Sequence, residues 1–234
     1  MAVGAGQASV TWAMPAIRRA DPRYYAAIVA NEVLGGGYSS RLNEEIRIKR
    51  GLSYGAGSTV DARRAPGLFV ARVQTKNESA PEVAELMLSE LQTLRTAPAP
   101  AEEIAARQAS LTGGYGRNLE TTEGLAKTLG TYVLQDVPAS EIGRYDTDVR
   151  QVTPAEAQAF AQAALDPAGA DLIVVGDAKL FAPALRAKYP QLELIQASDL
   201  DLDSPSLRRP PAAQSRHATG ATLKSRRSAS AARP

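Results

Sequence analysis

The chain has 234 residues, of which 44% are hydrophobic and 22% charged, enough for one domain with a well-buried core and an appendage. It has no cysteine, which excludes disulfides, thiolate zinc sites and catalytic thiols, and its one histidine, His217, lies in a Ser, Ala, Arg and Pro-rich segment, so histidine chemistry in a folded pocket is almost excluded. The formal net charge is +2, but residues 1–197 alone carry −2, so the folded part offers no basic surface for nucleic acid.

The first third of the chain predicts a strand and two helices. Residues 7–14 alternate apolar and polar side chains, which is typical of a half-buried strand. A helix is expected from the cap Asp21 to a stop at Gly35, and a second from the cap Ser39 to Arg50, ended by Gly51. Gly35, Gly36 and Gly37 between them are expected to form a close turn with positive φ, which glycine adopts without penalty.

The rest of the chain predicts further strands and helices in an α+β order. Residues 52–62 and 67–75 favour an antiparallel pair of strands, because a short Arg-Arg-Ala-Pro turn separates them. The later segments are expected, in chain order, as helices over 83–95, 101–116, 121–136 and 155–165, a strand over 170–177, a helix over 179–188 and a strand over 192–195. This order predicts a single α+β domain over residues 1–197, with helices packed on a mostly antiparallel sheet.

The C-terminal segment has a different composition. Residues 198–234 have seven basic and three acidic side chains and almost no large apolar residue, so we expect a disordered, solvated tail. No run of 18 apolar residues and no signal peptide are visible, so we expect no membrane span. The sequence is compatible with a soluble protein of the bacterial cytoplasm or periplasm and leaves the compartment open.

Several motifs that suggest chemistry have simpler structural explanations. The glycine run follows a helix and lacks the spacing of a phosphate-binding loop. Glu44 and Glu45 suit the first half of a helix, where Glu45 can pair with Lys49. Arg47 in the last turn of that helix and Tyr54 at the start of the next strand are each explained, taken alone, by the helix dipole and by ring packing.

The longer stretch of sequence around Arg47 and Tyr54 suggests a function for these two residues. The stretch NEVLGGGYSSRLNEEIRIKRGLSYGAGS, with its flanking segments from residue 6 to 196, resembles the pitrilysin/insulinase-type zinc metallopeptidases, a family that includes the mitochondrial processing peptidase. Family members have similar α+β domains of the LuxS/MPP-like type around a chamber. One domain carries the zinc motif H-x-x-E-H, and the opposing domain supplies an arginine and a tyrosine.

The resemblance implies that this chain is the zinc-free partner domain, since one histidine cannot form H-x-x-E-H. Arg47 and Tyr54 match the family's arginine and tyrosine, with Ile46 at a position that is usually leucine, and would bind the substrate and stabilise the transition state. Gly35, Gly36 and Gly37 are a candidate substrate or partner loop. We expect no metal or cofactor in this chain, zinc in a homologous partner domain or subunit, a heterodimer, and a peptide substrate.

Two alternatives remain open at the level of sequence. Relatives of this fold also serve as inactive core subunits of respiratory complexes, so a structural or assembly role without peptidase activity is the alternative function. The chain could also be a fragment, because it starts only a few residues before the first strand. Substrate preference, partner identity and the role of the tail are not predicted.

Overall fold

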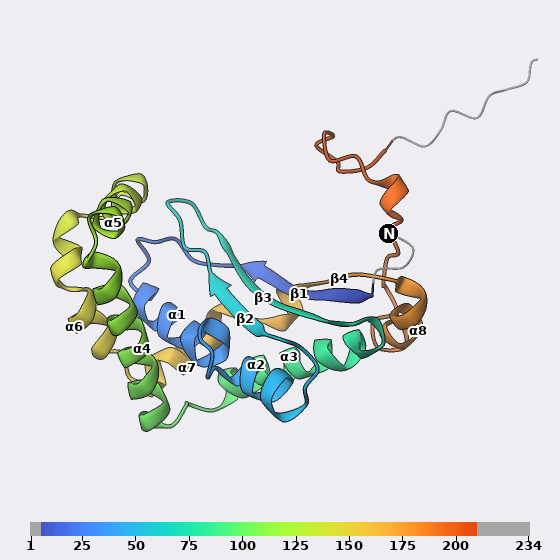
Figure 1. Ribbon diagram of the computed structural model, residues 1–234, viewed down its shortest axis with the longest axis horizontal. Coiled ribbons are helices and arrows are strands. Elements are labelled where there is room, and N and C mark those ends of the chain that lie inside the picture. Colours follow the sequence, from blue (N-terminus) through green and yellow to red (C-terminus); the bar gives the residue numbers. More distant parts are fainter. Residues whose placement is uncertain (1–5, 210–234) are drawn as a thin grey trace, which may run out of the picture. The chain divides into compact units, whose positions relative to one another are not determined.

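The computed structural model describes residues 6–209, which divide into a domain that ends at Leu194 and a short second unit that begins at Ile195. The domain is built on a four-stranded antiparallel sheet with strand order β2-β3-β1-β4 (Figure 1). These strands are β1 (Gln7–Pro15), β2 (Ala56–Val60), β3 (Leu68–Lys76) and β4 (Asp171–Val175). The predicted α+β class is confirmed.

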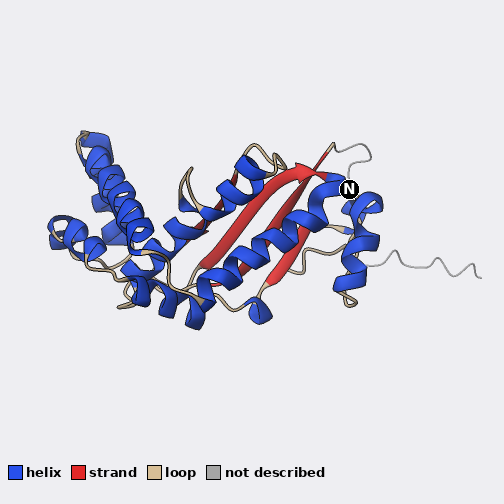
Figure 2. Ribbon diagram, turned by 90° about the horizontal axis from the view of Figure 1, so that it is seen from below, coloured by secondary structure: helices blue, strands red, loops and turns tan. Residues whose placement is uncertain are grey.

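Helices cover one face of this sheet. In β1 the side chains of Val10, Trp12 and Met14 are buried, as the alternating pattern predicts, and point to the helical layer. Figure 2 shows helices lying over one face of the strands. The Ala84 carbonyl of helix α3 (Ala80–Thr96) accepts a hydrogen bond from Trp12 Nε1–H at 3.2 Å. Helices α1 (Tyr24–Asn31) and α7 (Pro154–Ala164) complete this layer.

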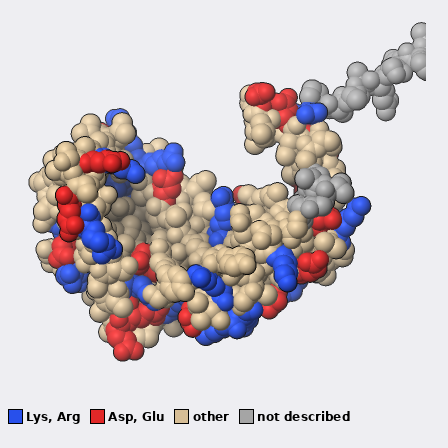
Figure 3. Space-filling view, viewed as in Figure 1, with Lys and Arg blue, Asp and Glu red and all other residues tan. Residues whose placement is uncertain are grey.

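A second group of helices lies beside the sheet. It contains α4 (Ala101–Leu119), α5 (Thr122–Leu134), the 3₁₀ turn η4 (Ala139–Gly143) and α6 (Tyr145–Arg150). Figure 3 shows a hollow near these helices, with charges of both signs interspersed on the face in view.

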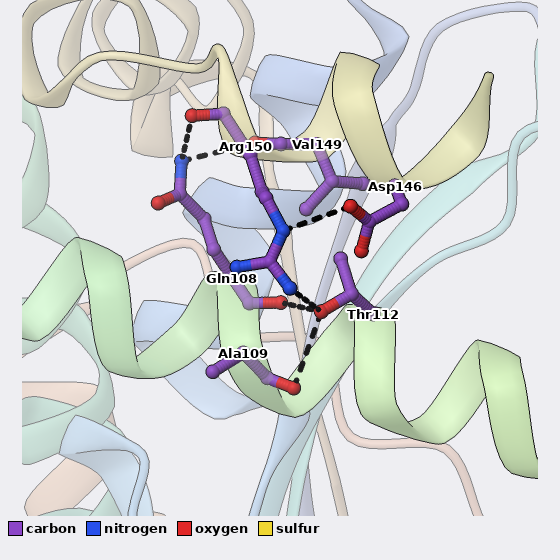
Figure 4. A network of polar contacts seen from close by, with 6 residues as sticks. All are labelled: Gln108, Ala109, Thr112, Asp146, Val149 and Arg150. Carbon is purple, nitrogen blue, oxygen red and sulfur yellow. Dashed lines mark hydrogen bonds and ion pairs between the residues drawn. The ribbon is translucent and has the colours of Figure 1, made fainter.

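Buried Gln108 joins α4 to the end of α6 (Figure 4). Its amide nitrogen Nε2 donates to the carbonyls of Val149 at 2.9 Å and Val152 at 2.8 Å. Thr112, one turn further along α4, accepts a hydrogen bond from Arg150 at 3.2 Å. These contacts join α4 to α6 and to the residues that directly follow it, so the short helix α6 is held against α4.

The remaining elements are short or follow the prediction. Helix α8 (Ala178–Lys188) corresponds to the expected helix over 179–188, and α7 opens with the capping box of Thr153 and Glu156. Two further 3₁₀ turns are η3 (Asn77–Ser79) and η5 (Pro167–Gly169).

Two predicted helix starts and one predicted strand are wrong. The first helix begins at Tyr24, because Asp21 accepts the Arg23 backbone N–H and closes a turn around Pro22. The second follows Ser40, without a side-chain cap. Residues 192–195 form no strand, since a turn closed by the Leu192 N–H on the Tyr189 carbonyl leads into them.

The second unit is described only in part. Up to residue 209 it contains the 3₁₀ turn η6 (Ala197–Asp199) and a single β-bridge between Leu200 and Arg208. The prediction of disorder for the tail falls, from residue 210 to 234, outside the described residues. Among residues 6–209, no helix has the length and apolar character needed to cross a membrane.

Candidate functional site

The segment that carries Arg47 is a short helix with a widened end. It begins as α2 (Arg41–Asn43) and continues as the π-helical segment η2 (Glu44–Lys49). Gly51 ends it with a φ of 63°, and its N–H donates to the Arg47 carbonyl at 3.0 Å. This left-handed end is the kind of helix stop that glycine favours, so the predicted role of Gly51 is confirmed.

Tyr54 lies in a tight turn between this helix and β2. The Ser53 hydroxyl accepts the Gly55 N–H at 3.0 Å and donates to the Gly55 carbonyl at 2.7 Å. The Tyr54 side chain at the tip of this turn is 91% exposed, and within residues 6–209 its hydroxyl has no hydrogen-bond partner. The expectation that Tyr54 opens a strand and packs its ring is therefore wrong, because β2 begins only at Ala56.

The Arg47 side chain is half-buried, and its guanidinium lies against an aromatic ring. Its carbon Cζ lies 4.8 Å from the centroid of the Tyr38 ring. Within the described part of the chain, Arg47 forms no ion pair. The carboxylate of Glu45 is instead occupied by Lys49, at 3.0 Å as predicted, and by Arg50, and these hydrogen bonds lower the pKa of Glu45.

Asn43, one turn before Arg47, connects the two loops that carry the tyrosines. Its side-chain nitrogen Nδ2 donates to the Tyr38 carbonyl, and its oxygen Oδ1 accepts the Ala56 N–H at 3.2 Å. Asn43 is buried, so both bonds are shielded from water. The helix, the loop before it and the loop after it are therefore one rigid frame.

Helix α4 fixes the same frame from outside. Arg41 forms a bidentate pair with Glu103, with N–O distances of 3.1 and 2.8 Å, and Arg107 donates to the Ser39 hydroxyl at 2.7 Å. Both contacts hold the residues that follow the glycine run. The exposed side chains of the site are thus carried by a backbone that is held on several sides.

The three glycines differ from the expected turn. None of Gly35, Gly36 and Gly37 has a positive φ, so that expectation is wrong. Gly35 and Gly36 lie in the π-helical segment η1 (Glu32–Gly36), and Gly37 is extended with a φ of −134°. Gly35 is required for another reason: a Cβ there would lie 2.4 Å from the Ser58 backbone nitrogen, so its absence lets the helix touch β2.

We expect Gly35→Ala to lower the free energy of unfolding by about 1–3 kcal/mol, because the added methyl group meets the backbone of β2, which cannot move aside cheaply. Chemical denaturation measures this difference. Gly55→Ala is the matched control, since a Cβ at Gly55 meets nothing within 4 Å. Equal stability of the two variants would contradict the close packing of Gly35.

The sequence interpretation missed Tyr38 and Asn43. Asn43 left a weak signal, because asparagine is unfavourable inside a helix unless its side chain bonds to backbone groups. Tyr38 left no signal, since it lies nine positions before Arg47 and no helical or strand period links the two. Within the described residues, no group of three or more His, Asp or Glu side chains could hold a metal ion.

Comparison with known proteins shows which family of proteins this chain resembles. Residues 3–111 match the family model described as the peptidase M16 inactive domain. An uncharacterized zinc protease of Streptomyces coelicolor is 31% identical over 156 residues, which are 67% of this chain and 34% of that protein.

Solved structures agree with the family match. A peptidase M16 inactive domain from Pseudomonas fluorescens has 26% identity and a TM-score of 0.66, with 72% of this chain and 40% of that chain covered. A protease from Helicobacter pylori, 16% identical, shares the fold with a TM-score of 0.69 over 74% of this chain and 42% of its own. The chain therefore spans less than half the length of these relatives.

Proposed function

Residues 3–111 belong to the peptidase M16 inactive-domain family, and from this premise we propose that the chain is the noncatalytic half of a zinc metalloendopeptidase. In this proposal Arg47 and Tyr54 bind a peptide substrate opposite a zinc site in another domain or subunit. The chain itself cannot hold that zinc through H-x-x-E-H, because it has only one histidine.

The observation that carries the proposal is that both side chains keep their hydrogen-bond donors free. Tyr54 is 91% exposed, and Arg47 has no carboxylate partner within residues 6–209. Arg41, by contrast, gives its donors to Glu103. Free donors on a rigid frame are what a binding site for carbonyl oxygens needs.

The chemistry of peptide hydrolysis gives these donors a role. A bound zinc ion in the other half would polarise the scissile carbonyl and activate water. In the transition state, negative charge grows on the carbonyl oxygen. The Arg47 guanidinium and the Tyr54 hydroxyl would donate to that oxygen or to the neighbouring peptide backbone and so orient the substrate.

The glycine run would border the bound peptide. Gly36 is exposed and Gly37 is partly exposed, next to Tyr38, whereas Gly35 is buried against β2. Gly36 and Gly37 have no side chains that could block a peptide approaching Arg47. Gly35 would contribute only through its packing.

Reconstitution tests the proposal. The chain is coexpressed with an H-x-x-E-H-containing homologue from its own organism, and the purified complex is assayed on internally quenched peptides. We expect hydrolysis by the complex, none by either half alone, and none when the Glu of H-x-x-E-H is replaced by Gln. A stable complex without hydrolysis of any peptide would contradict the proposal and support the assembly role.

A further inference from the structure

Tyr38 is an exposed aromatic residue that the fold does not require. Its backbone is fixed, since the carbonyl accepts a hydrogen bond from Asn43, but its side chain is 67% exposed. Within the described residues its hydroxyl has no hydrogen-bond partner. The ring therefore contributes little to the core, and it lies against the Arg47 guanidinium.

A contact between a guanidinium and a ring leaves the hydrogen-bond donors of the guanidinium available. The five N–H groups of a guanidinium lie in its plane, whereas an aromatic ring attracts its face. A carboxylate would bind the same group through its edge and occupy the donors. A guanidinium on a ring thus loses rotational freedom and can still donate to a ligand.

Other arginines near the site are held in the opposite way. Arg41 gives two donors to Glu103, and Arg50 gives a donor to Glu45. Both therefore have donors committed to the protein itself. Arg47 differs from them in having a ring instead of a carboxylate.

We propose that Tyr38 is a positioning residue, which holds the Arg47 guanidinium on its ring so that the guanidinium edge is presented to the substrate. The part of this inference that concerns the substrate rests on the proposed function. The contact between the Tyr38 ring and the Arg47 guanidinium does not depend on it. Asn43 fixes the Tyr38 backbone, and the same residue fixes Ala56 beyond Tyr54. Asn43 therefore holds the Tyr38 backbone at a fixed position relative to the helix that carries Arg47.

The order of the Arg47 side chain tests the positioning directly. ¹⁵N relaxation of the Arg47 Nε–H group is measured in the wild type, in Tyr38→Leu and in Tyr38→Phe, with exposed Arg72 as an internal reference. We expect an ordered Arg47 in the wild type and in Tyr38→Phe, and in Tyr38→Leu a mobility like that of Arg72. Equal order in Tyr38→Leu and the wild type would overturn the inference.

Turnover of the reconstituted enzyme supplies a second readout. Tyr38→Leu should lower kcat/KM about two- to fivefold, the equivalent of one exposed cation–π contact, and Tyr38→Phe should restore it. In an Arg47→Ala background, Tyr38→Leu should have no further effect. An equal loss in that background would overturn the positioning role and leave the proposed function standing, whereas an Arg47→Ala variant with full activity would overturn the proposed function alone.

Discussion

Arg47→Ala is expected to lower kcat/KM of the assembled peptidase by about 10²- to 10³-fold, the usual effect of removing one preorganised donor to a developing oxyanion. The loss should fall mainly on kcat if the guanidinium bonds to the oxygen only in the transition state, and mainly raise KM if it binds the ground-state backbone. Steady-state kinetics on a quenched peptide separates the two. The free energy of unfolding should change by less than about 1 kcal/mol, because Arg47 forms no ion pair within residues 6–209 and its contact is with the exposed Tyr38 ring.

Arg186→Ala is the matched control for this variant. Arg186 is also an arginine in the last turn of a helix, α8, and is exposed, so its removal changes charge and helix dipole in the same way. It should leave kcat/KM unchanged. An equal effect of both substitutions would assign the loss to net charge and contradict a local role of Arg47.

Arg19→Met is expected to cost about 3–5 kcal/mol of folding free energy, because it removes the buried cation of a buried carboxylate. The exposed Arg144, 3.8 Å from the same carboxylate, replaces it only weakly. Arg19 and Glu141 are 6% and 7% exposed and form an ion pair that links the segment after β1 to η4. Tyr25 donates to the same carboxylate at 2.6 Å, and the Arg19 guanidinium carbon lies 3.6 Å from the centroid of the Tyr24 ring. Urea denaturation measures the change.

An exposed pair supplies the control for this prediction. Arg23 binds Asp21 at 2.8 Å with half of its side chain exposed, so Arg23→Met should cost less than about 1 kcal/mol. The double variant Arg19→Met/Glu141→Gln should be more stable than the sum of the single changes, since no unpaired charge stays buried. Additive losses would show that the two groups do not interact.

The same ion pair makes stability depend on pH. Burial alone raises the pKa of Glu141, but hydrogen bonds from Tyr25 and Arg19 outweigh it, so the pKa lies below its usual range. A carboxyl whose pKa is lower in the folded state contributes stability above the unfolded pKa of about 4.3, and this contribution is lost as the pH falls further. The wild type should therefore lose more stability below about pH 4 than Glu141→Gln does.

The sequence predicted the parts of the fold that depend on local rules. The alternation in β1 and the capping box at Thr153 each depend on a few neighbouring residues, and both are present. Gly51 as the end of the second helix belongs to the same class. The resemblance of residues 31–58 to a family of zinc metallopeptidases agrees with the family model that matches residues 3–111.

The remainder depends on contacts between distant residues. Arg19 and Glu141 are 122 positions apart, and Arg107 reaches Ser39 across 68. The role of Gly35 depends on its distance to Ser58 and not on its own turn. Periodicity and capping rules carry no information about such pairs, so the supports of the candidate site became visible only in the structure.

The central claim is that the loop carrying Tyr54 faces a metal held by another domain or subunit, and a distance to that metal tests it most directly. Because the chain has no cysteine, Gly55→Cys gives a unique site for a nitroxide label, and Gly143→Cys is the control; a Cβ meets nothing within 4 Å at either glycine. In the reconstituted complex the zinc is replaced by paramagnetic Co²⁺. We predict strong relaxation of the label at position 55 and weak relaxation at position 143; equal relaxation at both positions in a stable complex would contradict the claim.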